Sequence, residues 1–222
     1  MAFKNIVKIW NNNRIDKKNV EFLTKPTAPV EFPLSKYDKK IIKDLKDTAS
    51  RISCAGIAAN QIGHSKKIFI GFEDNSLKNF KIYINPEIIK KFDNSIVGAY
   101  QERVNHIHRK NPNDHIYEGC LSLPEAEFSF PRYHKIKVKY LNESGNETVE
   151  ILEKFHSQIF QHETDHLNGK TIAHRFLESL QKEKGGTLIP TGLEEIEDID
   201  EINKTIDILD NQFDLLSTLI SK

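Results

Sequence analysis

The 222-residue sequence predicts an α+β fold, built from hairpin-connected strands and amphipathic helices. Two observations support this prediction. Short segments of alternating apolar and polar residues, separated by turn residues, are typical of paired strands, and longer segments with apolar residues every three or four positions are typical of helices with one buried face. At this length the chain can bury one substantial core, and its composition requires no second one.

Composition and charge exclude several classes of function. Lys and Arg together number 32, and Asp and Glu together number 32, so no net charge favours nucleic acid or an anionic membrane as a partner. No segment approaches the roughly 20 apolar residues of a membrane span, and the N-terminal residues lack the pattern of a secretory signal. We therefore expect a cytoplasmic, bacterial-type protein, with an organellar matrix as the alternative, and no direct binding to nucleic acid or membrane.

The first third of the chain predicts an arm followed by a helix. Residues 1–34 are polar and contain three prolines, which predicts an irregular arm along the surface. Residues 35–52 predict a helix, because Ser35 can cap it, Asp38 follows three residues later, and the apolar residues recur on one face. In the next segment, "CAGIAANQIG" (54–63), small residues allow the backbone to approach another part of the chain closely.

The middle of the chain predicts strands. The segments "KIFIGF" (67–72) and "FKIYINPEI" (80–88) have the alternation of two strands joined by a polar loop, and residues 134–155 predict a β-hairpin around "NESGNE". Residues 98–117 are polar and predict a long loop. Three histidines in this loop are expected to be exposed rather than to bind a metal: His106, His108 and His115.

The segment "QHETDHLNG" (161–169) carries the clearest chemical signal. It lies in a predicted helix that Gly169 ends. His162 and His166 are four residues apart, about one helical turn, so both imidazoles leave the same face and can bind one metal ion. Glu163 follows the first histidine directly. A polar helix with two surface histidines is the alternative, but this spacing is uncommon by chance, so the sequence favours a metal site.

The C-terminal residues predict a further helix. From Ile199 to Ile220, apolar residues recur every three or four positions without a break. A terminal amphipathic helix packs on its own domain more often than on a partner, so we expect a monomer. A dimer formed through this helix is the alternative.

Two histidines leave a metal ion short of ligands, and a carboxylate, another histidine or a thiolate could complete the site. The two cysteines, Cys54 and Cys120, are more consistent with reduced thiols than with a disulfide. Taken alone, Cys120 beside Leu121 and Leu123 is more typical of a small buried side chain than of a ligand. The residues by themselves therefore leave the third ligand open.

Three motifs in order resemble those of the peptide deformylase family: "GIAANQ" (56–61), "EGCLS" (118–122) and "HETDHLNG" (162–169). The likeness extends over roughly residues 35–180. It implies antiparallel sheets wrapped around a central metal-binding helix, with an N-terminal helix and an extended C-terminal helix. It also implies a catalytic domain at residues 1–184, followed by a linker and amphipathic helix at 185–222.

The resemblance implies Cys120, His162 and His166 as the ligands of one divalent metal ion, with a fourth position open for water. Fe²⁺ is the metal that the family implies, although Zn²⁺, Ni²⁺ and Co²⁺ also suit one thiolate and two imidazoles. The metal would lower the pKa of the water. Glu163 would take a proton from that water and deliver it to the leaving amine.

Further roles follow from the same resemblance. The Gln61 side-chain amide and the backbone N–H of Leu121 would stabilise the oxyanion, although Gln61 could equally be a structural hydrogen-bonding residue. Gly56 would let the substrate main chain lie alongside as an added strand, and Phe155 and Ile159 would line the methionine pocket. The expected reaction removes the N-formyl group from formyl-methionine on nascent polypeptides near the ribosome and releases formate.

Three other polar residues and one departure from the first motif each have a functional and a structural interpretation. Glu118, Arg132 and Asp165 could hold the ligands in place, but Arg132 and Asp165 are equally consistent with an ordinary ion pair or a solvated role. Cys54 stands where the first family motif has a glycine. It could narrow the site, but simple burial is the favoured interpretation.

Two alternative functions stay open. A metallopeptidase also uses H-E-x-x-H, but the metzincin pattern would require a histidine at Ile172, and His174 comes two residues late. Glu183 or Glu194 could instead serve as a thermolysin-like third ligand. The second alternative is a deformylase-like protein that binds polypeptide N-termini without turnover.

Overall fold

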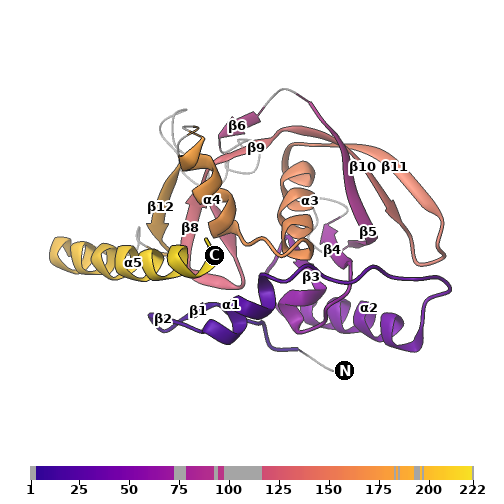
Figure 1. The fold of residues 1–222 in the computed structure, drawn as a ribbon, viewed down its shortest axis with the longest axis horizontal. Helices are drawn as coiled ribbons and strands as arrows, with labels where there is room; N and C mark the ends of the chain where they lie inside the picture. The colour runs from indigo at the N-terminus through magenta and orange to yellow at the C-terminus, as the bar shows by residue number, and fades with distance from the viewer. Residues whose placement is uncertain are drawn as a thin grey trace.

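The computed structural model describes residues 4–72, 79–92, 95–97, 117–182, 186–192 and 198–221, together with Lys184 and Ile196 (Figure 1). Residues 98–116 of the loop predicted at 98–117, with His106, His108 and His115, lie outside the described residues. So do Glu183 and Glu194, the two glutamates considered as alternative ligands.

The largest sheet has five antiparallel strands in the order β11-β10-β5-β4-β3. The strands are β3 (Gly56–Ala58), β4 (Ile68–Phe72), β5 (Phe80–Lys91), β10 (Lys135–Leu141) and β11 (Glu147–Glu153). In β4, Ile70 pairs with Ile57 on one side and Ile82 on the other. The predicted strand pair and hairpin are confirmed, and β3 forms one edge of the sheet.

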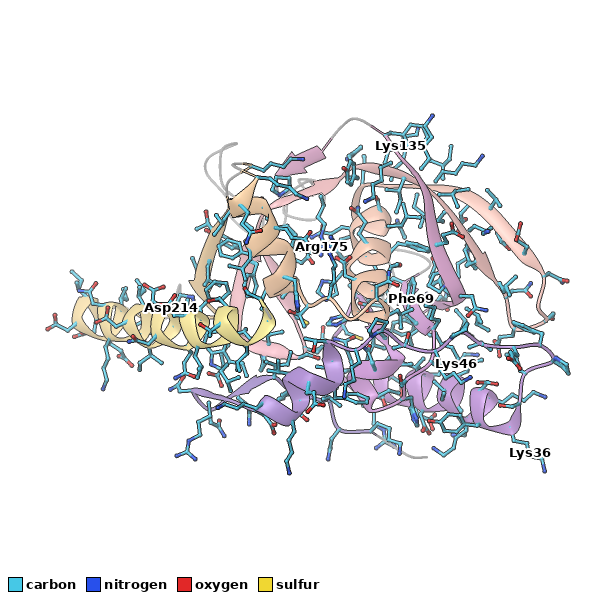
Figure 2. The ribbon with its side chains drawn as sticks, in the orientation of Figure 1. Lys36, Lys46, Phe69, Lys135, Arg175 and Asp214 are labelled. Carbon is cyan, nitrogen blue, oxygen red and sulfur yellow. The ribbon has the colours of Figure 1, made fainter. Side chains whose placement is uncertain are left out.

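Helix α3 (Lys154–Leu167) packs against this sheet, with which Figure 1 shows it side by side. Phe160 of α3 contacts Phe69 and Tyr83 edge to face, with ring centroids 5.3 Å apart in each pair. Figure 2 shows Phe69 in the interior beside α3, whereas charged side chains such as Lys36 project outward. The helix ends as predicted, since Gly169 adopts a positive φ of 73°. This arrangement confirms the expected α+β fold.

Three smaller sheets are also present, and two of them lie in the middle and C-terminal parts of the chain. One has the order β12-β8-β7, and the other pairs β6 with β9. Their bounds are β6 (Ser95–Val97), β7 (Glu118–Cys120), β8 (Leu123–Ser129), β9 (Pro131–Tyr133) and β12 (Thr187–Pro190). β7 is therefore an edge strand, like β3 in the larger sheet.

The first predicted helix is present as α2 (Lys36–Ala49). The Ser35 hydroxyl accepts from the Asp38 backbone N–H, and the Asp38 carboxylate accepts from the Ser35 backbone N–H, so the expected cap forms. The small-residue segment after it forms β3 and a short 3₁₀ helix, η1 (Ala59–Ile62). Gly63 ends η1 with a φ of 85°.

The prediction of an irregular N-terminal arm is wrong for residues 10–23, whereas residues 24–34 form no helix or strand. β1 (Trp10–Asn11) pairs with β2 (Arg14–Ile15), and α1 (Lys17–Leu23) follows with Asp16 as its N-cap. Trp10 and Leu23 are fully buried. Burial against the rest of the chain outweighs the weak local propensity of these polar residues, and the prolines come only after α1.

The C-terminal helix α5 (Ile199–Ile220) packs on its own chain, as expected. Its buried residues, Leu209, Phe213 and Leu216, belong to one apolar cluster with Cys120, Leu123, Phe128 and Phe176. Phe176 comes from α4 (Ile172–Gln181), a helix that the sequence patterns did not indicate. Among the described residues, no helix is long and apolar enough to cross a membrane.

Candidate metal centre

Three side chains with metal-binding atoms meet where β7 ends against α3. The Cys120 Sγ lies 3.3 Å from His166 Nε2, which lies 3.2 Å from His162 Nε2. All three ligand atoms are within 4.8 Å of one another. The helix turn brings the two imidazoles to one face, and the end of β7 supplies the thiol. The structure thus brings together the three residues that the motifs indicated.

The charge state of Cys120 suits a cation. Burial raises the pKa of its thiol, but the neighbouring His166 and His162 outweigh burial and lower the pKa to about 5. The thiolate is the form that binds metals. One buried thiolate and two imidazoles form a donor set that fits one divalent ion, with a position left for a further ligand.

A buried ion-pair network holds His162. Its Nδ1–H donates to Glu118 Oε1 over 2.5 Å, so Nε2 is the nitrogen left for a metal. Arg132 donates to both Glu118 oxygens, at 2.7 and 3.1 Å, and to Asp165 at 2.6 Å. Asp165 also pairs with Arg175. Arg132 and Asp165 are thus neither solvated nor isolated, since they form an ion pair that positions Glu118.

Glu163 lies beside the three ligands without a strong partner. Its side chain is 4% exposed, and its Oε2 has no hydrogen-bond partner among the described residues. Burial raises the pKa of this carboxyl to about 7, although His162 and His166 act in the opposite direction. A carboxyl with a pKa near neutrality can both accept and release a proton under ordinary conditions.

Gln61 and Leu121 also lie near the ligands. Gln61 Oε1 accepts from the Ala58 backbone N–H at 2.9 Å, and Nε2 lies 3.8 Å from Cys120 Sγ and 3.4 Å from Ser122 Oγ. Gln61 is thus a structural hydrogen-bonding residue through its oxygen, while its nitrogen is directed toward the site. Leu121 is half-buried and lines the same cavity.

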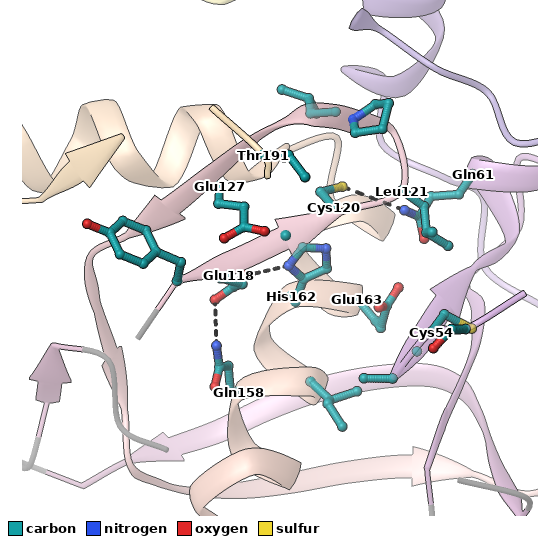
Figure 3. Close-up of a pocket in the computed structure, with 18 of the residues that line it drawn as sticks. Cys54, Gln61, Glu118, Cys120, Leu121, Glu127, Gln158, His162, Glu163 and Thr191 are labelled. Atoms are coloured by element: carbon teal, nitrogen blue, oxygen red, sulfur yellow. Dashed lines mark hydrogen bonds and ion pairs between the residues drawn. The ribbon is translucent and has the colours of Figure 1, made fainter. Parts of the chain in front are cut away.

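Two of the ligands, Cys120 and His162, line a cavity of about 440 Å³, which Figure 3 shows in close-up. It lies between the edge strands β3 and β7. Gly56 of β3, and Phe155 and Ile159 of α3, are among the residues that line it. A Cβ atom at Gly56 would lie only 2.7 Å from Glu163 Oε1, so a glycine here leaves room for the glutamate.

Cys54 differs from the favoured expectation of simple burial. It is half-buried and lines the cavity on the same side as Glu163 (Figure 3). Burial raises the pKa of its thiol to about 12, and the charge of Glu163 adds to the effect. The side chain therefore borders the space available to a ligand as a neutral thiol.

Several residues at the site were not indicated by the sequence. Asn60 Nδ2 donates to the backbone oxygen of His166 at 2.7 Å, and Gln158 Nε2 donates to Glu118 at 3.1 Å. Gln158 stands four residues before His162, so helical spacing could have identified it. Glu127 and Thr191 also line the cavity, and no local pattern distinguishes them.

Comparison with known proteins agrees with this geometry. A family model described as polypeptide deformylase matches residues 13–183. The chain belongs to the polypeptide deformylase family. The peptide deformylase of Brachyspira hyodysenteriae is 35% identical over 163 residues, which cover 70% of this chain and 77% of the relative.

Two solved deformylase structures resemble the fold. The crystal structure of peptide deformylase from Thermotoga maritima gives a TM-score of 0.60 at 29% identity and covers 78% of this chain and 97% of that one. A class I type b peptide deformylase from Acinetobacter baumannii, crystallised with Met-Ala-Ser, gives a TM-score of 0.60 at 25% identity, covering 78% and 98%.

Membership in the deformylase family decides between the enzyme classes considered. The protein is a metal-dependent hydrolase, and the metallopeptidase interpretation is wrong. His174, which comes two residues after the position that the metzincin pattern requires, interacts through Nδ1 with the Thr171 backbone N–H and hydroxyl at the start of α4.

Proposed function

We propose that this protein removes the N-formyl group from the terminal formyl-methionine of newly made polypeptides, near the ribosome, and releases formate. The observation that carries the proposal is the position of Glu163. Glu163 lines the same cavity as the ligands Cys120 and His162, and its Oε2 has no hydrogen-bond partner among the described residues. Amide hydrolysis needs such an acid–base group beside the attacked carbon.

The chain's own residues would divide the work as follows. When bound, the metal ion supplies Lewis-acid activation of water and of the formyl oxygen. Glu163 accepts the proton of the attacking water as the new C–O bond forms. It then donates this proton to the nitrogen as the C–N bond breaks, leaving formate and a free amine. Gln61 Nε2 and the Leu121 backbone N–H donate to the oxyanion.

The substrate would bind as an added strand. Both β3 and β7 are edge strands, and the cavity lies between them. An extended peptide can pair with an exposed strand edge through its main chain, which suits an enzyme with many substrate sequences. Gly56 has no side chain, so the β3 side of the cavity stays open. Phe155 and Ile159 contact the methionine side chain. The related structure with bound Met-Ala-Ser supports a peptide as the molecule that binds in such a site.

Further aspects of the proposal concern its setting. The native metal would be Fe²⁺, which suits a thiolate and two imidazoles, as do Zn²⁺, Ni²⁺ and Co²⁺. The protein would act in a bacterial-type cytoplasm or an organellar matrix. A catalytic domain at 1–184, consistent with the family match to 13–183, would precede a linker and helix at 185–222. Burial of the α5 apolar residues in the same chain supports a monomer.

Formate release from formyl-Met-Ala-Ser tests the proposed function. Protein purified anaerobically and loaded with Fe²⁺ should release one formate for each new amino terminus. The protein loaded with Zn²⁺, Co²⁺ or Ni²⁺ serves to compare metals. Bound metal and bound peptide without formate would instead support a protein that only binds polypeptide N-termini.

Substitution of Gly56 by alanine should impair catalysis more than folding. The new Cβ would lie within 3.0 Å of Glu163 Oε1, Cγ and Cδ, so the carboxylate must move. A displaced acid–base group typically costs about 10- to 100-fold in rate. We expect kcat/KM for formyl-Met-Ala-Ser to fall by that factor while the midpoint of thermal unfolding changes little. In a Glu163→Ala background the same substitution should have almost no further effect.

A further inference from the structure

Away from the cavity, one buried histidine has no role in the chemistry proposed above. His64 follows η1, is 8% exposed, and contacts helix α2 through both nitrogens of its ring. Its Nε2 lies 3.0 Å from Asp44 Oδ2, and its Nδ1 lies 3.0 Å from the Tyr37 hydroxyl. We propose that His64 is a positioning residue, which holds Gln61 where its amide reaches the oxyanion. This inference rests on the proposed function.

The contacts of His64 fix it to α2. Burial raises the pKa of Asp44, but hydrogen bonds from Lys40 and His64 outweigh burial and lower this pKa, so the carboxylate is charged at neutral pH. With its proton on Nε2, the imidazole can donate to this carboxylate and accept from the Tyr37 hydroxyl at Nδ1. Tyr37 and Asp44 are seven residues apart, so His64 is held by two successive turns of the helix.

The backbone carries this anchor to Gln61. Gly63, with a φ of 85°, separates η1 from His64, whose backbone N–H donates to the Ala59 oxygen over 2.9 Å. Because glycine restricts the backbone least, the end of η1 needs side-chain contacts to keep its place. Ile62 supplies apolar contacts, since it is buried in one cluster with residues of α2, and His64 supplies the polar ones. Loss of the polar contacts should therefore loosen η1 without unfolding it.

The position of Gln61 decides how well its amide can act. Figure 3 shows the amide directed toward Cys120, with Nε2 at 3.8 Å from Sγ. Nε2 also lies 3.4 Å from Ser122 Oγ, which is longer than the usual range of about 2.7 to 3.2 Å. These weak contacts leave the amide to be held through η1. A donor stabilises an oxyanion only if it is already in place, so a small shift of η1 should slow the reaction more than it weakens peptide binding.

Steady-state kinetics with formyl-Met-Ala-Ser test the inference. His64→Phe keeps an aromatic ring but loses both hydrogen bonds. We expect kcat to fall about tenfold, less than the roughly 10²-fold typical for loss of a whole oxyanion donor, while KM stays within about twofold. In a Gln61→Ala background the same substitution should lower kcat no further, because it acts through that side chain.

Two comparisons separate positioning from a loss of stability. Leu216→Ala is the matched control, because it removes a fully buried side chain of α5 from a different apolar cluster than that of α2. It should lower the midpoint of thermal unfolding without lowering kcat. Asp44→Asn keeps an oxygen that can accept from His64 Nε2–H, whereas Asp44→Leu removes the acceptor. Most of kcat should be kept in Asp44→Asn and lost in Asp44→Leu.

Nuclear magnetic resonance reports the position of Gln61 without turnover. In ¹⁵N-labelled protein loaded with Zn²⁺, the side-chain amide signal that Gln61→Ala removes belongs to Gln61. This signal should move in His64→Phe and stay in place in Leu216→Ala.

The outcomes are distinct. A wild-type kcat in His64→Phe, or an equal loss of kcat when Gln61 is already alanine, would overturn the role of His64 and leave the proposed function intact. The same holds if the Gln61 amide signal does not move in His64→Phe. Absence of formate from the wild-type protein would overturn the proposed function and this inference with it.

Discussion

Replacing Glu163 by alanine should lower kcat for formate release by about 10²- to 10⁴-fold while the protein keeps its metal ion. The three ligand side chains belong to other residues, so the donor set is unchanged. Among the described residues, Glu163 is the one carboxyl that lines the cavity beside the ligands and has an oxygen without a hydrogen-bond partner. The substitution removes this group. No other proton acceptor with these properties takes its place.

The stability of the Glu163→Ala protein, unlike its activity, should not fall. Glu163 is buried, and burial raises the pKa of its carboxyl, which means that the folded protein disfavours the charged form. Removing a poorly compensated buried carboxyl relieves this cost, so the midpoint of thermal unfolding of metal-loaded protein should be unchanged or higher. Such a gain in stability with a loss of activity is typical of a catalytic residue.

The measurements are formate release, metal content by elemental analysis and thermal unfolding. Glu153→Ala is a suitable control, because Glu153 caps the same helix and pairs only at the surface with Lys135. It should leave kcat unchanged. A Glu163→Ala protein that retains more than a tenth of wild-type kcat with full metal content would show that another group moves the proton.

Replacing Cys120 by serine should remove most of the bound metal, and turnover with it. The environment of Cys120 lowers the pKa of the thiol to about 5, so it offers an anionic sulfur at neutral pH. A serine hydroxyl stays protonated there and is a poor ligand for Fe²⁺ or Zn²⁺. His162 and His166 alone make too few bonds to hold the ion firmly. We expect the metal content to fall from about one ion per chain to near none after dialysis.

The second cysteine provides the control. Cys54→Ser also replaces a thiol by a hydroxyl, at a position that borders the cavity but lies outside the ligand set. It should keep its metal. Retention of a full equivalent of metal by Cys120→Ser, with Cys54→Ser also loaded, would mean that another residue supplies the third ligand. Circular dichroism of both variants checks that the apolar cluster containing Cys120 is still folded.

Local patterns predicted the regular elements that depend on neighbouring residues. The Ser35 and Asp38 cap and the apolar spacing of α2 act within one or two turns, so they can be read directly from the sequence. The same holds for the turn of the β10–β11 hairpin and the continuous apolar spacing of α5. The N-terminal elements were missed because Trp10 and Leu23 form them through burial against distant residues.

The sequence by itself indicated two of the metal ligands, because the H-E-x-x-H spacing acts within one helical turn. The three motifs in combination indicated the family and, through the resemblance, Cys120 as the third ligand and Glu163 as the proposed acid–base residue. Only the tertiary structure decided which side chains surround that chemistry. Arg132 joins Glu118 to Asp165, Cys54 borders the cavity as well as the core, and Glu127 lines the cavity beside Gly119. These positions depend on how β3, β7 and β8 pack around α3, and no pattern of neighbouring residues encodes contacts between strands so far apart in the chain.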